Sequence, residues 1–230
     1  MILLQGGPIP SGGAPSPRDM RSHFVPPPPR KLPAPAGPGI LLVDLSYRPG
    51  SLSADEFVAP VGRIVRQEGF SPEALHYQEV ARDDLASAAG AILCGTALAD
   101  CGYLDRMDRF AWIPSFPRPL LGICAGMQVI VQVFGGGVSP GTGIGMAGQE
   151  VAAPDPLLAG RDRFEAYELH SLSVTPPPSF RVLARSLSGV QVIRHPDRPL
   201  YGVMFHPEVR NEWLIRRFLA LCGGMDAGHG

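Results

Sequence analysis

The sequence is poor in charge of either sign and almost devoid of lysine. Charged residues make up 18% of the 230 residues, the formal net charge is -1, and Lys31 is the single lysine. Because binding to nucleic acid needs a concentration of basic charge, this composition argues against that class of partner. The hydrophobic fraction of 45% argues against a disordered chain and is ample for one buried core.

Long hydrophobic runs and paired cysteine motifs are also missing. The longest apolar stretch, residues 119–138, is interrupted by Gln128, Gln132 and several glycines, and no secretory signal pattern precedes it. We therefore expect a cytoplasmic protein with no membrane partner. The four cysteines show no C-x-x-C spacing, which argues against a disulfide framework and against a zinc site. We expect no metal and no other cofactor.

Proline and glycine are unevenly distributed along the chain. Residues 1–39 hold 11 of the 26 prolines and 6 of the 28 glycines. Such a segment buries too little apolar surface to offset the entropy lost on ordering. The sequence therefore predicts a flexible extension over 1–39, one domain over 40–222 and a flexible tail over 223–230.

After Gly39, short apolar runs alternate with stretches of helical periodicity. This pattern is typical of a parallel sheet with crossover helices. Ser53 and Glu56 have the spacing of a capping box at the start of the first helix. The expected strands are Ile40–Leu45, Leu75–Val80, Ala91–Cys94 and Pro119–Ile123, with helices over 54–68 and 103–110.

From about Gly135 the pattern changes to glycine-rich turns and shorter alternating segments. Alternation with period two favours antiparallel strands that belong to the same sheet system. The sequence thus predicts an α/β fold, with a doubly wound mixed sheet and additional antiparallel strands in the C-terminal half. The expected elements are strands over 149–153, 164–174, 181–186, 189–194 and 200–205, and a closing helix over 211–221.

Cys124 follows a buried apolar strand and has glycine two positions before and two after it. The run Gly122-Ile123-Cys124-Ala125-Gly126 is the pattern of a nucleophile elbow, a strained strand-to-helix turn that projects a reactive side chain. A cysteine at a helix N-terminus gains a stabilised thiolate, and the amides that follow it point toward an oxyanion. We therefore expect Cys124 to be an exposed nucleophile.

A candidate base for this nucleophile lies near the C-terminus. The apolar run Tyr201–Phe205 delivers His206 at its end, and Glu208 lies two residues further on. A carboxylate at that spacing can accept a hydrogen bond from the imidazole and fix its tautomer. Alone, such a motif is more often a surface turn, but the cysteine elbow reverses that balance.

Together, the Gly122–Gln128 segment and Phe205-His206-Pro207-Glu208 resemble the class I, triad-type glutamine amidotransferases over about residues 40–221. The resemblance implies a flavodoxin-like sheet with extra antiparallel strands. It also implies a triad with Cys124 as nucleophile, His206 as base and Glu208 as the orienting acid.

Two further segments resemble parts of the same family. Gly95 and Thr96 stand where the family has a glycine-containing oxyanion strand, although Thr96 replaces its second glycine. The resemblance assigns the other oxyanion amide to the residues after the cysteine, beginning with Ala125. The segment Leu169–Val174 is similar to the glutaminase subunits of chorismate-using synthases, which implies glutamine contacts at three positions. These positions are Gln128, Ser171 and Leu172.

The resemblance implies that L-glutamine is hydrolysed to glutamate and ammonia through a cysteinyl thioester. The sequence contains no P-loop and no other site that would use ammonia. We therefore expect the ammonia to pass to a separate synthetase or synthase subunit. The Phe205–Val209 segment is similar to archaeal-type glutaminase subunits of GMP synthase, which favours that acceptor, whereas the Leu169–Val174 segment favours a chorismate-using synthase.

Two other hypotheses stay open on the sequence. A γ-glutamyl hydrolase or related peptidase would use the same cysteine and histidine and need no partner, and a silent regulatory subunit would keep the fold without turnover.

The spacing of His170 favours a packing or loop role near the substrate. Three further histidines have no visible partner, and the other cysteines lack the elbow pattern. These residues are His76, His195 and His229, and Cys94, Cys101 and Cys222.

Overall fold

The computed structural model describes residues 37–224. Most of the expected extension (1–39) and tail (223–230), together with His229, lies outside the described residues. The inner ends of both ranges belong to regular elements, because the first strand begins at Gly39 and the last helix ends at Gly224.

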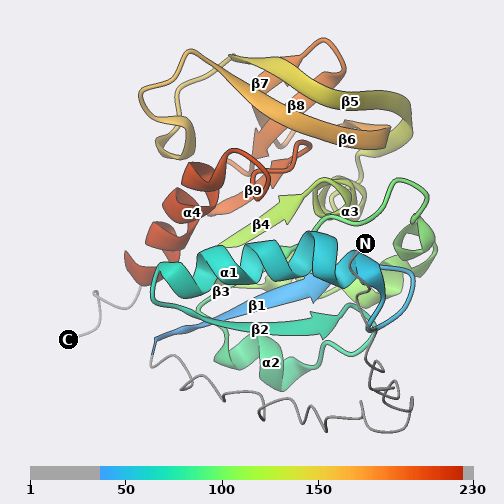
Figure 1. Ribbon diagram of the computed structural model, residues 1–230, viewed down its shortest axis with the longest axis vertical. Coiled ribbons are helices and arrows are strands. Elements are labelled where there is room, and N and C mark those ends of the chain that lie inside the picture. Colours follow the sequence, from blue (N-terminus) through green and yellow to red (C-terminus); the bar gives the residue numbers. More distant parts are fainter. Residues whose placement is uncertain (1–36, 225–230) are drawn as a thin grey trace, which may run out of the picture. The chain divides into compact units, whose positions relative to one another are not determined.

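Within residues 37–224, nine strands form one sheet in the order β2-β1-β3-β4-β9-β8-β7-β5-β6 (Figure 1). The five strands from β2 to β9 in this order are parallel, and the remaining pairings are antiparallel. The strands are β1 (Gly39–Asp44), β2 (Ser71–His76), β3 (Gly90–Leu93), β4 (Leu120–Ile123), β5 (Gly137–Val151), β6 (Arg163–Thr175), β7 (Arg181–Ser186), β8 (Gly189–Arg194) and β9 (Leu200–Val203).

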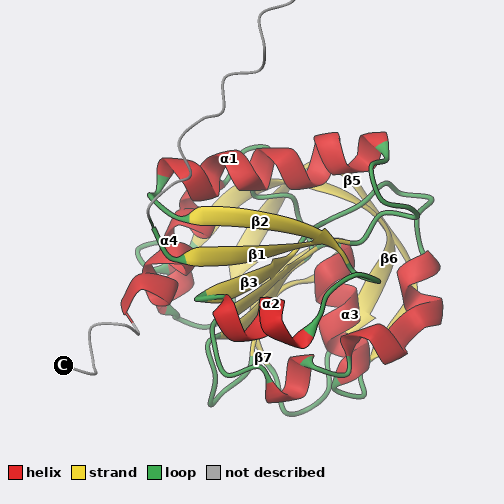
Figure 2. Cartoon of the chain, turned by 90° about the horizontal axis from the view of Figure 1, so that it is seen from below, coloured by secondary structure: helices red, strands yellow, loops and turns green. Residues whose placement is uncertain are grey.

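Helices cover both faces of the parallel strands. Figure 2 shows α1 on one face and α2 on the other. The helices are α1 (Ala59–Gln67), α2 (Arg82–Ser87), α3 (Ala125–Val133) and α4 (Glu212–Gly224), with a π-helical segment at Ala54–Val58 and 3-10 segments at Gly102–Phe110, Ile113–Ser115 and Pro156–Leu158. No helix in this part of the chain is both long and apolar enough to cross a lipid bilayer.

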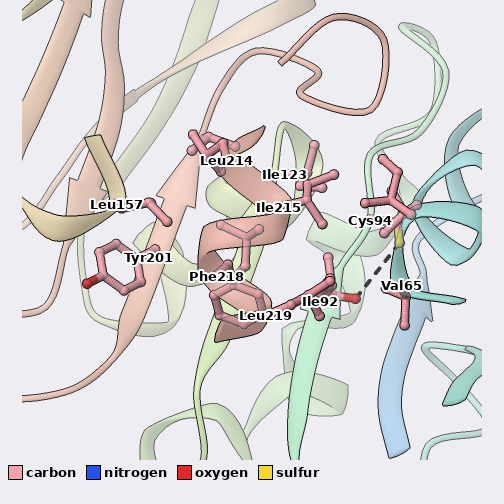
Figure 3. Packing of buried hydrophobic residues seen from close by; sticks show 14 of the residues in the cluster. Val65, Ile92, Cys94, Ile123, Leu157, Tyr201, Leu214, Ile215, Phe218 and Leu219 are labelled. Carbon is pink, nitrogen blue, oxygen red and sulfur yellow. Dashed lines mark hydrogen bonds between the residues drawn. The ribbon is translucent and has the colours of Figure 1, made fainter. Parts of the chain in front are cut away.

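Alternate residues of the parallel strands feed two separate hydrophobic clusters. In β4, Leu121 and Ile123 pack into the cluster beneath α1 and α4, whereas Leu120 packs into the cluster beneath α3. Phe218 and Leu219 of α4 are buried in the first cluster (Figure 3). This use of both faces explains the continuous apolar runs of the central strands, since no residue there faces water.

The expected fold class is confirmed: the chain forms a doubly wound α/β sheet whose C-terminal half adds antiparallel strands. The strands at 181–186 and 189–194 have the bounds that the sequence predicts. The short helix expected at 103–110 is a 3-10 segment, and the closing helix runs three residues further than expected, to Gly224.

Two expectations for the first half were wrong. The second strand is Ser71–His76 rather than Leu75–Val80, because it is an edge strand with a partly exposed, polar start and therefore carries no apolar run. The capping box also does not form, since Ser53 already has helical backbone angles and its side chain caps no amide. The helix passes through a π-helical stretch before Pro60, which lacks the N–H of a regular helical hydrogen bond.

The glycine-rich segment after Gly135 also differs from expectation. It is not a series of turns but the long strand β5, which pairs with β6 along most of its length. Many β5 side chains are exposed, so glycine there costs little burial and hides the strand in the sequence. Helix α2 was not expected, because none of its six residues is buried.

Candidate active site

Cys124 lies between the end of β4 and the first residue of α3. Its backbone has φ 49° and ψ -103°, and among the described residues it is the one non-glycine residue with positive φ. This strained turn aims the side chain across the carboxyl ends of the parallel strands. The side chain is buried rather than exposed as expected, because β6 covers it: the Cys124 Sγ lies 3.6 Å from the Leu169 carbonyl oxygen.

The glycines on either side of Cys124 are required by the space around the turn. A Cβ atom on Gly122 would lie 2.5 Å from the backbone carbonyl of Gly126, and one on Gly126 would lie 2.3 Å from the Leu93 carbonyl oxygen. Both distances are too short for any side chain. The G-x-C-x-G spacing thus follows from close backbone packing of α3 on β3 and β4.

His206 follows β9, whose last residue Val203 accepts a hydrogen bond from the Cys124 amide at 2.7 Å. The His206 Nδ1 lies 2.8 Å from the Glu208 Oε1, and both side chains are almost fully buried. The other ring nitrogen, Nε2, is buried and has no hydrogen-bond partner within residues 37–224. Glu208 therefore fixes the ring through Nδ1 and leaves Nε2 free for the thiol.

The electrostatic surroundings favour a charged imidazolium at His206. Burial lowers its pKa, but the neighbouring Cys124 thiolate and the Glu208 carboxylate outweigh burial and hold the pKa of His206 well above the usual range of histidine. A positively charged imidazole is a group that can stabilise a neighbouring thiolate, which is the reactive form of a cysteine nucleophile.

The other described cysteines have surroundings of a different kind. Burial, together with the charges of Glu208 and Asp44, raises the pKa of Cys94 well above that of an ordinary thiol. Burial also raises the pKa of Cys222 to about 12. Both side chains therefore stay protonated and act as core fillers, while Cys101 is exposed in the loop after β3.

The backbone of β6 runs alongside the segments that carry His206, Cys124 and Gln128. Its carbonyl groups accept hydrogen bonds from the His206 amide at 2.9 Å and from the Cys124 thiol and the Gln128 amide nitrogen at longer range. The three acceptors are the carbonyl oxygens of Tyr167, Leu169 and Leu172. Because β6 is the last strand of the sheet, this edge would otherwise have no partner strand.

A narrow cavity of about 20 Å³ lies in front of Cys124. It holds about one water molecule, so an amino-acid ligand requires the lining loops to move. A wider hollow of about 760 Å³, lined by residues 151–162, includes none of the expected site residues. The narrow cavity is lined by Thr96, Ala97, Leu98, Asp100, Cys101, Tyr103, Cys124, Ala125, Gln128, Leu169, His170, Ser171 and Leu172.

Most of the site residues expected from the sequence meet at this cavity. Thr96, Ala125, Gln128, Ser171 and Leu172 line it together with Cys124. Gly95 is not part of the lining but packs against His206, where a Cβ would lie 2.7 Å from the His206 Cε1. His206 and Glu208 lie behind the cavity and are not part of its lining.

The polar side chains of the cavity are engaged with one another. The Gln128 Oε1 accepts a hydrogen bond from the Tyr103 hydroxyl at 2.5 Å, and its Nε2 donates to the Leu172 carbonyl at 3.4 Å. The Ser171 hydroxyl donates to the Leu98 carbonyl at 3.2 Å. Gln128 thus links α3 to Tyr103 and to β6, and Ser171 links β6 to the loop after β3.

The sequence reasoning missed the contribution of the loop after β3. Leu98, Asp100, Cys101 and Tyr103 line the cavity, and Asp100 accepts a hydrogen bond from the Thr96 hydroxyl at 2.9 Å. One signal was available, because this loop leaves from the carboxyl end of a parallel strand, where ligand-binding loops of such sheets gather.

A sequence profile of the family described as Glutamine amidotransferase class-I matches residues 65–220. The chain belongs to this family. Its match includes Cys124, His206 and Glu208 as well as the β6 strand, so the site described above lies within the family domain.

Two similar proteins are subunits of the same kind of enzyme. The chain is 40% identical over 138 residues to a subunit of glutamine-hydrolysing GMP synthase from Methanothrix thermoacetophila, covering 56% of this chain and 76% of that protein. It is 38% identical over 139 residues to the corresponding protein from Pyrococcus abyssi, covering 56% and 72%.

Solved structures agree in fold. A candidate GMP synthase subunit from Thermoplasma acidophilum aligns with TM-score 0.72 at 24% identity, covering 82% of this chain and 96% of that one. A glutamine amidotransferase from Thermotoga maritima aligns with TM-score 0.60 at 20% identity, covering 82% and 84%. The described fold is therefore shared with these two solved structures.

The close packing at the elbow yields a test of the fold at this point. Gly126→Ala should lower the free energy of unfolding by about 1–3 kcal/mol, because its methyl group would overlap the Leu93 carbonyl oxygen. Urea denaturation measures the change. Gly102→Ala is the matched control, since a Cβ there meets nothing within 4 Å. Equal stability of the two variants would contradict the packing described for the elbow.

Proposed function

We propose that this chain is the glutamine-hydrolysing subunit of a two-subunit GMP synthase and that Cys124, His206 and Glu208 form its catalytic triad. The proposal is carried by one observation: a cysteine on a strained strand-to-helix turn is hydrogen-bonded through its backbone to the end of β9, and the segment that follows β9 carries a buried histidine whose Nδ1 is bound by a carboxylate. Membership of the amidotransferase family and the names of the relatives support it.

In the proposed reaction, the Cys124 thiolate attacks the side-chain carboxamide carbon of glutamine, and His206 holds the thiol proton as imidazolium. The tetrahedral oxyanion forms beside the start of α3. The amides of residues 125–127 precede the first intrahelical hydrogen bond, from the Gln128 amide to the Cys124 carbonyl, and so are available as donors. The peptide at Gly95 and Thr96 is the proposed second donor.

Collapse of this intermediate breaks the C–N bond and leaves a glutamyl thioester on Cys124. His206 Nε2 gives its proton to the leaving ammonia and then takes one from the water that hydrolyses the thioester. Glu208 holds the ring through Nδ1 in both half-reactions. The products are glutamate, which takes the water oxygen, and ammonia.

Glutamine recognition is proposed for the strand and helix that face the thiol. The backbone at Ser171 and Leu172 is suited to the α-amino and α-carboxylate groups, because it lines the cavity in front of the nucleophile. Gln128 contributes from α3, where it already links the Leu172 carbonyl to Tyr103. The Ser171 and Leu172 roles rest on backbone groups and so tolerate changes of side chain.

The ammonia acceptor is proposed to be a separate synthetase subunit that forms GMP. The names of the relatives favour this acceptor. The similarity of Leu169–Val174 to chorismate-using synthases makes that acceptor the alternative. A γ-glutamyl hydrolase would need no acceptor at all, so the partner experiment below separates the three.

The first test addresses the nucleophile. Cys124→Ala should abolish glutamine hydrolysis, because no other described cysteine lies on the elbow. Glutamate release in a coupled assay measures the rate. Cys222→Ala, which changes a buried thiol in the core, should keep the rate within about threefold. Turnover retained in Cys124→Ala would rule out the proposed nucleophile.

A second test ranks the other two triad residues. His206→Ala should lower kcat by about 10²- to 10⁴-fold, whereas Glu208→Gln should cost less, because it removes positioning but not the base. Since the Glu208 carboxylate raises the pKa of His206, Glu208→Gln should also move the alkaline limb of the kcat/KM profile to lower pH. An unmoved limb would show that Glu208 does not act through His206.

A third test identifies the acceptor. The isolated chain should hydrolyse glutamine slowly, and the GMP-forming synthetase subunit with its nucleotide substrates should raise the rate, because no ammonia-using site was found in this sequence. Glutamine labelled with ¹⁵N in the amide should then give labelled GMP. Label in a chorismate-derived product would favour the alternative acceptor. Full turnover without any partner, with γ-glutamyl peptides preferred, would favour a hydrolase.

A further inference from the structure

Two ionisable side chains on the buried face of β6 have no part in the proposed chemistry. Glu168 and His170 are separated by one residue, so they project from the same side of the strand, and they are 1% and 2% exposed. Leu169 lies between them, and its carbonyl oxygen is the group that contacts the Cys124 thiol. The two side chains therefore flank the residue whose carbonyl contacts the thiol, and His170 also lines the cavity in front of Cys124.

His170 connects β6 to β5. Its Nδ1 lies 3.1 Å from the Gly141 carbonyl oxygen, and its Nε2 lies 3.5 Å from the Glu168 Oε2. Gly141 belongs to the irregular part of the pairing, where the register shifts between Pro140 and Gly143. Each ring nitrogen therefore lies near an oxygen atom, one on β5 and one on β6.

Glu168 connects β6 to two further elements. Its Oε1 accepts a hydrogen bond from the Gln149 side chain of β5 at 2.8 Å, and its Oε2 accepts one from the Ser188 hydroxyl between β7 and β8 at 2.5 Å. Burial raises the pKa of Glu168, but hydrogen bonds from His170, Ser188 and Gln149 outweigh it and lower the pKa to about 2. Glu168 is thus ionised at neutral pH.

A glycine on the neighbouring strand leaves room for the side chains of Glu168 and His170. Gly143 of β5 lies opposite His170, and a Cβ there would lie 2.3 Å from the Glu168 Oε2 and 2.5 Å from the His170 Nε2. Gly143 does not have positive φ, so its backbone conformation is open to other residues. The glycine is therefore needed for room and not for a turn.

We propose that Glu168 and His170 are positioning residues that hold the β6 edge at the correct place for glutamine binding. The inference rests on the proposed function, since it assigns the pair to the glutamine site. The buried contacts of the two side chains with each other, with Gly141 and with Gln149 pin the position of β6 where the register with β5 is irregular, and so fix the cavity-lining backbone at Ser171 and Leu172.

A fixed edge matters because β6 pairs with a strand on one side only. The pairing with β5 sets the position of β6, but the register shift between Pro140 and Gly143 leaves Ser171 without a residue opposite it on β5. Misplacement of a binding group by about 1 Å can cost about 10²-fold in rate. The side-chain contacts of the pair supply the constraint that the backbone ladder lacks there.

Steady-state kinetics of four variants test the inference. In Glu168→Gln, His170→Asn and Gly143→Ala, the KM for glutamine should rise about tenfold or more while kcat stays within about threefold. His170→Asn retains a donor for Gly141 but lacks the contact with Glu168. Gly148→Ala is the matched control on β5, because a Cβ there meets nothing within 4 Å, and it should leave KM unchanged.

Alkylation of Cys124 by iodoacetamide separates positioning of the substrate from damage to the thiol. The rate should stay within about threefold of wild type in all variants, since the reagent needs access to the Cys124 thiol but does not need the contacts to the α-amino and α-carboxylate groups at Ser171 and Leu172. A KM in Gly143→Ala equal to that in Gly148→Ala would overturn the inference, as would alkylation falling in step with kcat/KM. If Gly143→Ala does not fold, Glu168→Gln and His170→Asn decide. A wild-type chain that is alkylated but hydrolyses no glutamine would instead contradict the proposed function.

Discussion

The arrangement of the proposed site depends on the backbone conformation of Cys124. A non-glycine residue held at φ 49° is unfavourable unless the surrounding structure compensates for it. Here β4 enters the turn from a fully buried position, α3 leaves it at once, and the flanking glycines Gly122 and Gly126 let both elements approach without side chains between them. The reactive sulfur is therefore placed by the packing of the core rather than by a flexible loop.

The edge strand β6 supplies the second wall of the site. In most sheets an unpaired edge exposes its carbonyl groups, but here those groups accept hydrogen bonds from the loops that carry His206, Cys124 and Gln128. The antiparallel half of the sheet therefore serves to bring a backbone edge over the carboxyl ends of the parallel half. The contact between Glu168 and His170 lies on the same strand.

The sequence predicted the parts of the structure that depend on residues close in the chain. Turns and core strands have local sequence patterns. The sequence therefore predicted the elbow around Cys124, the His206-x-Glu208 spacing and the buried central strands. Contacts between distant segments, such as the Tyr103 hydrogen bond to Gln128, could not be predicted from local patterns. Strand β5 was hidden for a related reason, since the glycine at 143 makes sense only once the side chains across the ladder are known.

The most direct test of the account is to trap the thioester. Wild-type chain turning over ¹⁵N- and ¹³C-labelled glutamine would be quenched in acid and digested, and the peptides would be analysed by mass spectrometry. The account predicts a labelled glutamyl group on the peptide that contains Cys124, with its carbon label retained and its amide nitrogen lost. A glutamyl group on the peptide of Cys94, Cys101 or Cys222, or turnover with no adduct on any cysteine, would contradict it.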